Sequence, residues 1–334
     1  MSTISWLFYI NFAIFAVFLT LFFTELMGAV LLLVRYEQTK ARVLAHVVPI
    51  WEVTGTFAAF WVVTGDFAYP SMLIPVASIF AGYILVFLIL LVARNASISF
   101  AEYIIKRAWL DEKKLYQVYA VATILIGAVV VLILSTIVSG AGIDLGTLSF
   151  SLGSWLTNPG SLPYLLGVVV LAAGLAPIFY GVTELRRWAL PVTALGIVLE
   201  TVALYAYSRG FITGWFVVPA VFTLLPALLF LHPRTAPIVT NKVVFAIVGF
   251  LIIFSQSYLV HPTAFAHATG GPLPVQAVTT TGPMVDAFLV LSTAGLVIVG
   301  LLMIFYLYAV NQPAGSVPGR ASPPPGGQAE PRGP

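Results

Sequence analysis

Long apolar segments recur along this chain and constrain its fold more than any other feature of the sequence. There are nine, each close to the length of about 20 residues that a helix needs to cross the hydrocarbon core of a membrane. Their bounds are 4–34, 44–66, 70–93, 115–139, 162–183, 189–207, 212–231, 243–260 and 286–310. Backbone groups in lipid need internal hydrogen-bond partners, and the alternation typical of barrel strands is not visible. The segments therefore predict membrane-spanning helices.

The composition indicates that lipid, rather than water, is the solvent of this chain. Hydrophobic residues make up 60% of the sequence and charged residues 8%, and the mean hydropathy is +1.04. Soluble domains average about 25% charged residues. We therefore predict an all-α polytopic protein of the plasma membrane. The net charge of +3 is too small to indicate nucleic-acid binding.

The basic residues predict how the chain is threaded through the membrane. If the N-terminus lies outside, fourteen of the fifteen Lys and Arg residues fall in inner segments, and only Arg209 lies outside. Cytoplasmic loops carry an excess of positive charge. The inner segments are 35–43, 94–114, 184–188, 232–242 and the tail from Asn311. This pattern predicts an outer N-terminus and a cytoplasmic C-terminus, and it agrees with nine crossings.

We expect two four-helix bundles and one C-terminal helix within a transmembrane domain over residues 1–310. The first half covers 1–140, the second covers 141–260, and the ninth helix covers 286–310. A basic loop, a span, a tight outer turn and another span recur around 184–231, which suggests a loose internal duplication.

Two segments on the predicted inner side differ from the spans. The inner loop 95–114 is amphipathic, with Phe100 and Trp109 among its apolar residues, and we expect it to lie along the cytoplasmic surface. Residues 311–334 are rich in Pro and Gly and lack apolar periodicity. They predict a disordered cytoplasmic tail without chemistry.

Three carboxyl groups within the predicted spans are the candidate functional residues. Glu25 lies in the inner half of the first span, Glu52 in the inner half of the second, and Glu200 near the middle of the sixth. An acidic residue near the centre of a membrane helix costs about 2.5–3.5 kcal/mol on insertion scales. Such a group either has a buried partner or handles protons, so we expect a proton pathway, with a structural hydrogen bond as the alternative for each residue. The two antiparallel spans place Glu25 and Glu52 at similar depth.

The other residue patterns argue against chemistry carried by this chain alone. It has no Cys, which excludes disulfides and thiolate metal sites. Its four His residues lie at or beyond the ends of the predicted spans, without a metal-ligand spacing. A Gly-rich phosphate loop and a Ser/His/Asp set are also missing from the sequence. We expect no catalytic residue, no metal site and no heme ligand.

The segment Pro49-Ile50-Trp51-Glu52 resembles the Pro-His-Trp-Asp motif of subunit II of the cytochrome bd quinol oxidases. That family continues with an aromatic-Pro turn, here Tyr69-Pro70, and with an Arg, here Arg94, before a Ser/Phe/acidic/aromatic segment, here 99–103. Nine helices and an outer N-terminus also fit the family. The likeness of motifs covers residues 20–105, and the remainder agrees in topology.

Two departures mark the chain as a divergent member of such a family. Phe57 stands where the family has a second tryptophan. The Asp-rich segment of the family, at the inner end of its first helix, is reduced here to Thr24-Glu25-Leu26-Met27-Gly28.

The resemblance implies a heme-free, non-catalytic subunit II of a membrane quinol:oxygen oxidoreductase. Hemes b and d would lie in the partner, subunit I, and this chain would stabilise that partner and supply part of a cytoplasmic proton pathway for the reduction of oxygen to water. Glu52 stands at the position of the family's proton-pathway Asp, and Trp51 at that of a Trp near a bound quinone or lipid. Whether a quinone is held here as a structural element, and whether a small third subunit is present, stay open.

The remaining candidate residues have assigned roles as well. Trp61 is a second candidate contact for quinone or membrane lipid, and Pro49, Pro70 and Arg94 are motif residues with a structural role.

Two other functions of the protein remain open. A proton-coupled secondary transporter would use Glu52 and Glu200 as coupling carboxylates at a repeat interface. A structural or assembly protein would hold all its carboxylates in fixed pairs.

Overall fold

The computed structural model describes residues 3–103, 111–144, 146–207, 211–257, 263–264, 273–274, 279–280 and 282–311. The helices are α1 (Thr3–Ala68), α2 (Pro70–Ile79), α3 (Ala81–Tyr103), α4 (Glu112–Ser139), α5 (Leu152–Thr157), α6 (Ser161–Phe179), α7 (Arg186–Tyr207), α8 (Val217–Leu231), α9 (Ala236–Val239), α10 (Lys242–Ser255) and α13 (Pro283–Asn311). Two 3₁₀ turns, η1 (Thr183–Leu185) and η3 (Gly214–Phe216), precede α7 and α8. Two hairpins pair β1 (Ile143–Asp144) with β2 (Ser149–Phe150), and β3 (Thr263–Ala264) with β4 (Leu273–Pro274).

The first helix, α1, folds back on itself and contains the first two predicted spans. A straight helix of its 66 residues would be about 99 Å long, several times the thickness of a membrane. The backbone of Arg35 leaves helical geometry, with φ −142° and ψ 47°, and the chain reverses there. The amide of Asn11 then donates to Thr64 at 3.2 Å. The two halves of α1 are therefore antiparallel neighbours.

The third predicted span, 70–93, is interrupted rather than continuous. It begins at Pro70 as predicted, because the first position of a helix needs no backbone N–H donor. Helix α2 then ends at Ile79, and Phe80 has the non-helical angles φ −103° and ψ 13°.

Helix α3 extends further than the sequence predicts. It continues to Tyr103, ten residues beyond the expected end of the span. The expectation of a surface helix over 95–114 is therefore wrong for residues 95–103, which prolong α3. Residues 104–110 of that loop lie outside the described part.

The apolar helices agree with the predicted all-α polytopic fold. Seven described helices are long and apolar enough to cross a membrane, with α1 counted once, and α2 and α10 are shorter apolar helices. If α1 is counted as two antiparallel halves, and α2 with α3 as the one interrupted span, the described residues hold nine apolar segments. They follow the predicted order along the chain.

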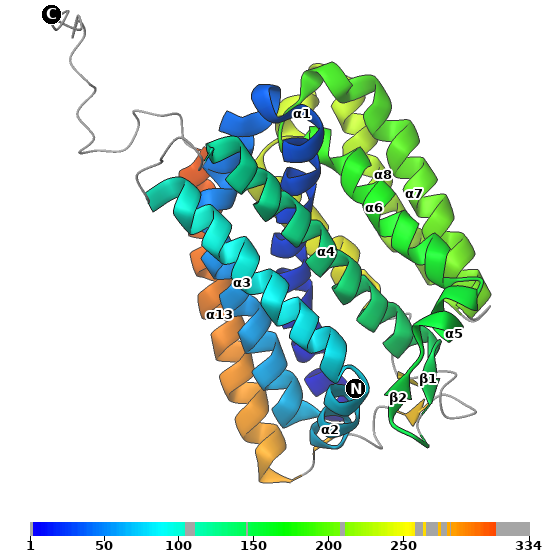
Figure 1. Ribbon diagram of the computed structural model, residues 1–334. Helices are drawn as coiled ribbons and strands as arrows, with labels where there is room; N and C mark the ends of the chain where they lie inside the picture. Colours follow the sequence, from blue (N-terminus) through cyan, green and yellow to red (C-terminus); the bar gives the residue numbers. More distant parts are fainter. Residues whose placement is uncertain are drawn as a thin grey trace, which may run out of the picture.

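Helix α1 lies at the centre of the bundle (Figure 1). It packs against α4, α6, α10 and α13, while α3 packs on α4 and α6 packs on α7. Helix α8 contacts both α7 and α10. Helix α1 thus touches elements of both predicted halves, and the division into two four-helix bundles stays a prediction.

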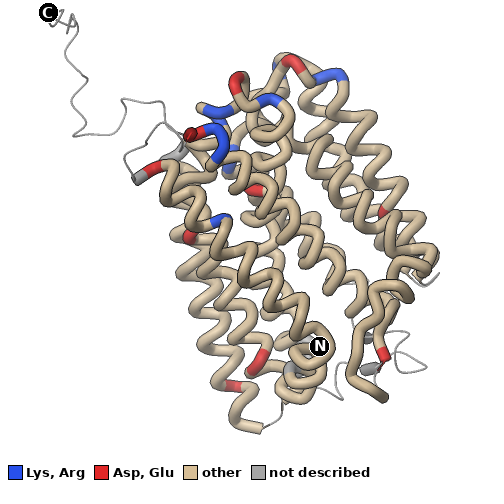
Figure 2. Tube along the Cα trace, viewed as in Figure 1, with Lys and Arg blue, Asp and Glu red and all other residues tan. Residues whose placement is uncertain are grey.

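Charge is distributed unevenly along the bundle axis. Figure 2 shows the described Lys and Arg residues gathered at the end where α1 turns back, and we call this end the basic end. The β1–β2 hairpin and α5 lie at the opposite end (Figure 1). Hydrogen bonds from Thr147 and from the amide of Gly146 lower the pKa of Asp144 in that hairpin. The positive-inside pattern predicts such an uneven distribution of charge. That the basic end faces the cytoplasm stays a prediction.

Candidate functional site

Glu25 lies at the centre of a buried polar cluster in which three donors meet one carboxylate. Its Oε2 atom is ion-paired with Arg94 of α3 and accepts a hydrogen bond of 2.9 Å from the hydroxyl of Tyr119 of α4. Its Oε1 atom accepts a hydrogen bond from Thr54, in the second half of α1. We call these four residues the Glu25 cluster. It joins both halves of α1 to α3 and α4.

The Glu25 cluster is closed to the surroundings. Glu25 is 0% exposed and Arg94 is 3% exposed. The guanidinium of Arg94 also lies over the ring of Tyr119, 5.4 Å from its centroid, and donates to the side chain of Asn95 at 3.1 Å. A buried charge is tolerated when it is paired and hydrogen-bonded, and both members of this pair meet that condition. The geometry stabilises Glu25 as an anion.

A second set of polar contacts begins at the neighbouring residue, Thr24. Its hydroxyl lies 3.1 Å from Nε2 of His46, and its backbone carbonyl accepts a 2.8 Å hydrogen bond from Tyr180, the residue that follows α6. His46 is fully buried, and its ring packs edge-on against Phe179. Residues 24 and 25 thus connect the first half of α1 with α3 and α4 on one side and with α6 on the other.

Glu52 does not face Glu25, although the two lie on neighbouring antiparallel segments. The side chain of Glu52 is exposed, and it forms no hydrogen bond or ion pair with any residue that the structure describes. Successive helical residues are separated by about 100°, so a residue two positions away lies on nearly the opposite face. Thr54 therefore points toward Glu25, and Glu52 points away from the bundle.

Glu200 belongs to a different part of the bundle. It lies on α7, partly buried against α6, where its Cγ atom packs over Gly167. Tyr164 of α6 lies close enough for an electrostatic interaction with it. The three carboxyl groups predicted from the sequence therefore occupy three separate environments.

The other predicted residues lie within the packing of the chain. Trp61 packs between Phe15, with ring centroids 4.5 Å apart, and Phe18, at 6.2 Å. Trp51 is partly buried against the largest apolar cluster of the core. Pro49 is inside the second half of α1 and is exposed, a position tolerated in membrane helices. Contacts of the two tryptophans with quinone or lipid stay predictions.

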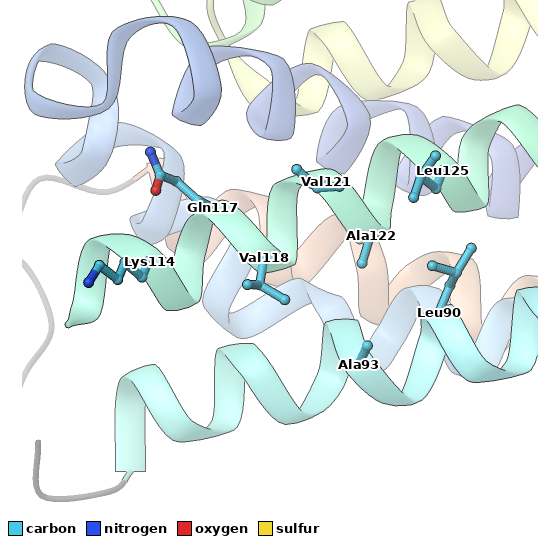
Figure 3. Close-up of a pocket in the computed structure, with 8 residues that line it drawn as sticks. All are labelled: Leu90, Ala93, Lys114, Gln117, Val118, Val121, Ala122 and Leu125. Atoms are coloured by element: carbon cyan, nitrogen blue, oxygen red, sulfur yellow. The ribbon is translucent and has the colours of Figure 1, made fainter. Parts of the chain in front are cut away.

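An apolar groove runs along the surface between α3 and α4 (Figure 3). It has a volume of about 460 Å³, and the residues that line it are Leu90, Ala93, Lys114, Gln117, Val118, Val121, Ala122 and Leu125. Lys114 and Gln117 are its polar side chains, and they lie toward the start of α4. Its lining contains neither of the two candidate tryptophans and no carboxylate. Within the described ranges, no three His, Asp or Glu side chains are grouped to hold a metal ion.

Removing the hydroxyl of Thr54 is expected to destabilise the protein. A Thr54→Val substitution keeps the shape of the side chain but takes one donor from a buried carboxylate, which costs about 1–3 kcal/mol. Thermal unfolding in mild detergent measures this loss. Thr293→Val is the matched control, because Thr293 is exposed on α13 and lies outside the Glu25 cluster. An equal effect of both variants would contradict the assigned role of Thr54.

Three members of the Glu25 cluster were not singled out as partners from the sequence. Arg94 was identified only as a motif residue, while Thr54 and Tyr119 are common types in membrane helices. One signal was available: an Arg near the end of a long apolar segment needs a counter-ion, and Glu25 is an intramembrane carboxylate at the inner end of another segment. That signal does not identify which carboxylate is the partner.

Comparisons with known proteins place the fold. No protein-family model and no curated protein matches the chain. Among solved structures, it is similar to a chain of the bd oxidase from Geobacillus thermodenitrificans, with a TM-score of 0.65 and 17% sequence identity over 93% of this chain and 98% of that chain. A likeness at this level of identity establishes the architecture. The protein is therefore an all-α polytopic membrane protein with the fold of a bd oxidase chain.

Proposed function

We propose that this chain is the heme-free subunit II of a cytochrome bd-type quinol oxidase, in which it stabilises a heme-bearing subunit I and contributes a proton pathway from the cytoplasm. The partner would hold the hemes and perform the oxidation of quinol and the reduction of oxygen to water. This chain would contribute no catalytic residue. The fold likeness to a bd oxidase chain and the motif around Glu52 support the proposal.

The observation that carries this proposal is the exposure of Glu52 within a membrane-spanning segment. A carboxyl group directed toward lipid without a partner is costly, because hydrocarbon offers it no hydrogen bond. No described residue of this chain pairs with Glu52, whereas Glu25 has three donors. A second subunit that covers Glu52 and offers it a donor or water removes this cost.

The surface around Glu52 has a pattern suited to a partner helix. Pro49, Glu52, Thr56, Ala59 and Val63 are each exposed or nearly so, at alternating intervals of three and four residues. This spacing keeps one stripe of a helix facing a neighbour over several turns. Most of these side chains are small, which allows close approach of a second helix in a membrane. We assign this stripe to the contact with subunit I.

The two candidate carboxyl groups of α1, those of Glu25 and Glu52, have different roles in this proposal. Glu25 is held by Arg94, Thr54 and Tyr119, so it serves as a fixed anion that anchors α1 against α3 and α4. Glu52 has no fixed partner among the described residues, and it lies at the proposed subunit boundary. We therefore assign the transfer of protons to Glu52 and the positioning of its helix to the Glu25 cluster.

Glu52→Gln is expected to lower the quinol oxidase turnover of the intact complex while its hemes are retained. Gln has nearly the shape of Glu but does not carry a transferable proton, and loss of a positioned acid–base group lowers rates by about 100-fold or more. Oxygen consumption with a soluble quinol measures turnover, and reduced-minus-oxidised visible spectra measure the hemes. Glu184→Gln, in the exposed η1 turn, is the matched control.

The outcomes separate the proposal from its alternatives. Full turnover in Glu52→Gln would contradict the proposed role of Glu52 in proton transfer but would leave the subunit assignment in place. A purified chain without a heme-bearing partner, together with proton-dependent solute uptake by vesicles that contain the chain alone, would replace the oxidase by a transporter.

A further inference from the structure

Three glycines on one side of the α6–α7 contact face three polar residues on the other, and both series are spaced by seven residues. The pairs are Gly160 with Tyr207, Gly167 with Glu200, and Gly174 with Thr193. A methyl group on Gly167 would lie 2.8 Å from Cγ of Glu200, so each polar side chain packs directly against helix backbone. Antiparallel helices repeat such a contact about every two turns. We call these six residues the α6–α7 seam.

The seam contains buried hydroxyl groups that lack partners. The side-chain oxygens of Tyr207, Thr193 and Ser161, the residue after Gly160, form no hydrogen bond with the described part of the chain. The residues themselves are 4%, 0% and 0% exposed. Each unpaired buried hydroxyl costs about 1–3 kcal/mol, which a bridging water removes. Several such groups at one interface therefore indicate bound water.

Two of these three hydroxyl groups, those of Ser161 and Tyr207, lie at the Tyr207 end of the seam, while Thr193 lies at its other end, beside Gly174. The hydroxyls of Ser161 and Ser135 lie next to that of Tyr207 but are not placed to bond to it. Ser135 instead accepts a 3.0 Å hydrogen bond from the indole of Trp155, which belongs to α5. The parts of α4, α5, α6 and α7 that carry these residues lie toward the end of the bundle away from the basic end (Figure 1). A water molecule there would have the two to four polar partners that it needs.

Glu200 is the ionisable group of the seam. It lies two helical turns, about 10 Å, from Tyr207 on the same face of α7. The ring of Tyr164 lies between these levels, 6.1 Å from the ring of Tyr207 and within electrostatic reach of Glu200. The helices packed along α7, which are α6 and α8, contain no Asp, Glu, Lys, Arg or His, and Tyr164 is their one titratable residue. Glu200 forms no hydrogen bond or ion pair within the described residues, which therefore offer it no counter-ion.

We propose that bound water occupies the Tyr207 end of the α6–α7 seam and makes Glu200 a proton-exchanging carboxyl group that is reached from the end of the bundle opposite the basic end. Protons would pass between Glu200, water and the hydroxyl groups, each transfer breaking one O–H bond and forming another. The ligand of the site is water, and the group that it serves is a single carboxyl. The inference does not depend on the oxidase assignment, because the seam involves neither Glu25 nor Glu52.

The position of the seam sets it apart from the Glu25 cluster. Helix α7 lies on the far side of the bundle from α3, which carries Arg94 (Figure 1). The carboxylate of Glu25 accepts from three donors of this chain, whereas the carboxyl group of Glu200 forms no hydrogen bond with the described residues. The two sites thus belong to different helices and differ in how their carboxyl groups are held.

Infrared difference spectroscopy of the intact protein in its native membrane tests the proposal. We expect a carbonyl band of a protonated carboxylic acid that is missing in Glu200→Gln and that shifts when the membrane is transferred to D₂O. In Tyr207→Phe the exchange that shifts the band should be about tenfold slower, because the loss of one hydrogen bond raises the barrier by the free energy that corresponds to this factor. Tyr205→Phe is the matched control, because Tyr205 lies on the same helix and is 52% exposed.

Two results would overturn the proposal. One is the lack of any carboxylic acid band that depends on Glu200. The other is an exchange rate in Tyr207→Phe equal to that of the unmodified protein, which would show a dry seam whose polar groups only join helices. If Tyr207→Phe does not accumulate in the membrane, the exchange rate is measured in Ser161→Ala instead. That variant removes a neighbouring hydroxyl group without changing a ring contact.

Discussion

Replacing Glu25 with Gln is expected to destabilise the protein strongly and to lower the yield of folded chain. The variant leaves the guanidinium of Arg94 buried, at 3% exposure, without its counter-ion. Breaking a buried pair on one side costs about 3–5 kcal/mol, which is a large part of the 5–15 kcal/mol by which proteins are stable. The yield of folded protein in mild detergent, and its unfolding by heat or by a denaturing detergent, measure the loss.

A double variant distinguishes a broken ion pair from a damaged core. In Glu25→Leu/Arg94→Met both charges are removed and apolar volume is kept, so most of the stability lost in Glu25→Gln should return. The proposed division of roles also predicts that this double variant, once folded, retains oxidase turnover. Continued instability of the double variant would contradict the assignment of the cost to an unpaired charge. If the double variant kept its stability and heme content but lost turnover, Glu25 would have to be assigned to the proton pathway.

The second large effect is expected at the contact between α6 and α7. A methyl group at Gly174 would lie 2.6 Å from the backbone nitrogen of Thr193, and backbone cannot move aside as a side chain can. Gly174→Ala should therefore separate the two helices and destabilise the protein by about 1–3 kcal/mol, as overpacking of a core does. Thermal unfolding of the purified protein measures the change.

Gly300→Ala is the matched control for this variant. Gly300 lies inside α13, and a methyl group there would meet nothing within 4 Å. Both substitutions bring the same gain in helix propensity, about 1 kcal/mol for Gly to Ala, so their difference isolates the clash. A change in stability equal to that of Gly300→Ala would mean that α6 and α7 are not packed as closely as the structure has them.

The course of the chain followed from one-dimensional signals. Apolar segments of membrane length and loops rich in Lys and Arg predict polytopic helices, and the structure agrees because these signals depend on the solvent of each segment rather than on its neighbours. The same reasoning was wrong for 95–103, where α3 continues. Amphipathicity there does not separate a helix along the surface from the protruding end of a span.

The candidate residues were only partly within reach of the sequence. An intramembrane carboxylate is recognisable from its position alone, which is how Glu25, Glu52 and Glu200 were selected. Whether such a group is paired depends on the rotation of its helix. A rotation equivalent to two residues would exchange Thr54 for Glu52 on the face toward Glu25. Because apolar residues surround the helix on every side, no periodicity in the sequence defines that rotation.

The sequence by itself therefore determined the solvent, the order of the spans and the positions of the costly polar groups, because each is a property of a residue and its local segment. The tertiary structure decided which of these groups meet. It buried Glu25 with Arg94, Thr54 and Tyr119, left Glu52 on the surface, and aligned Glu200 with Gly167 across two helices. Such pairings depend on the distance and rotation between segments that are far apart in the chain, and these are set by the packing of the whole bundle.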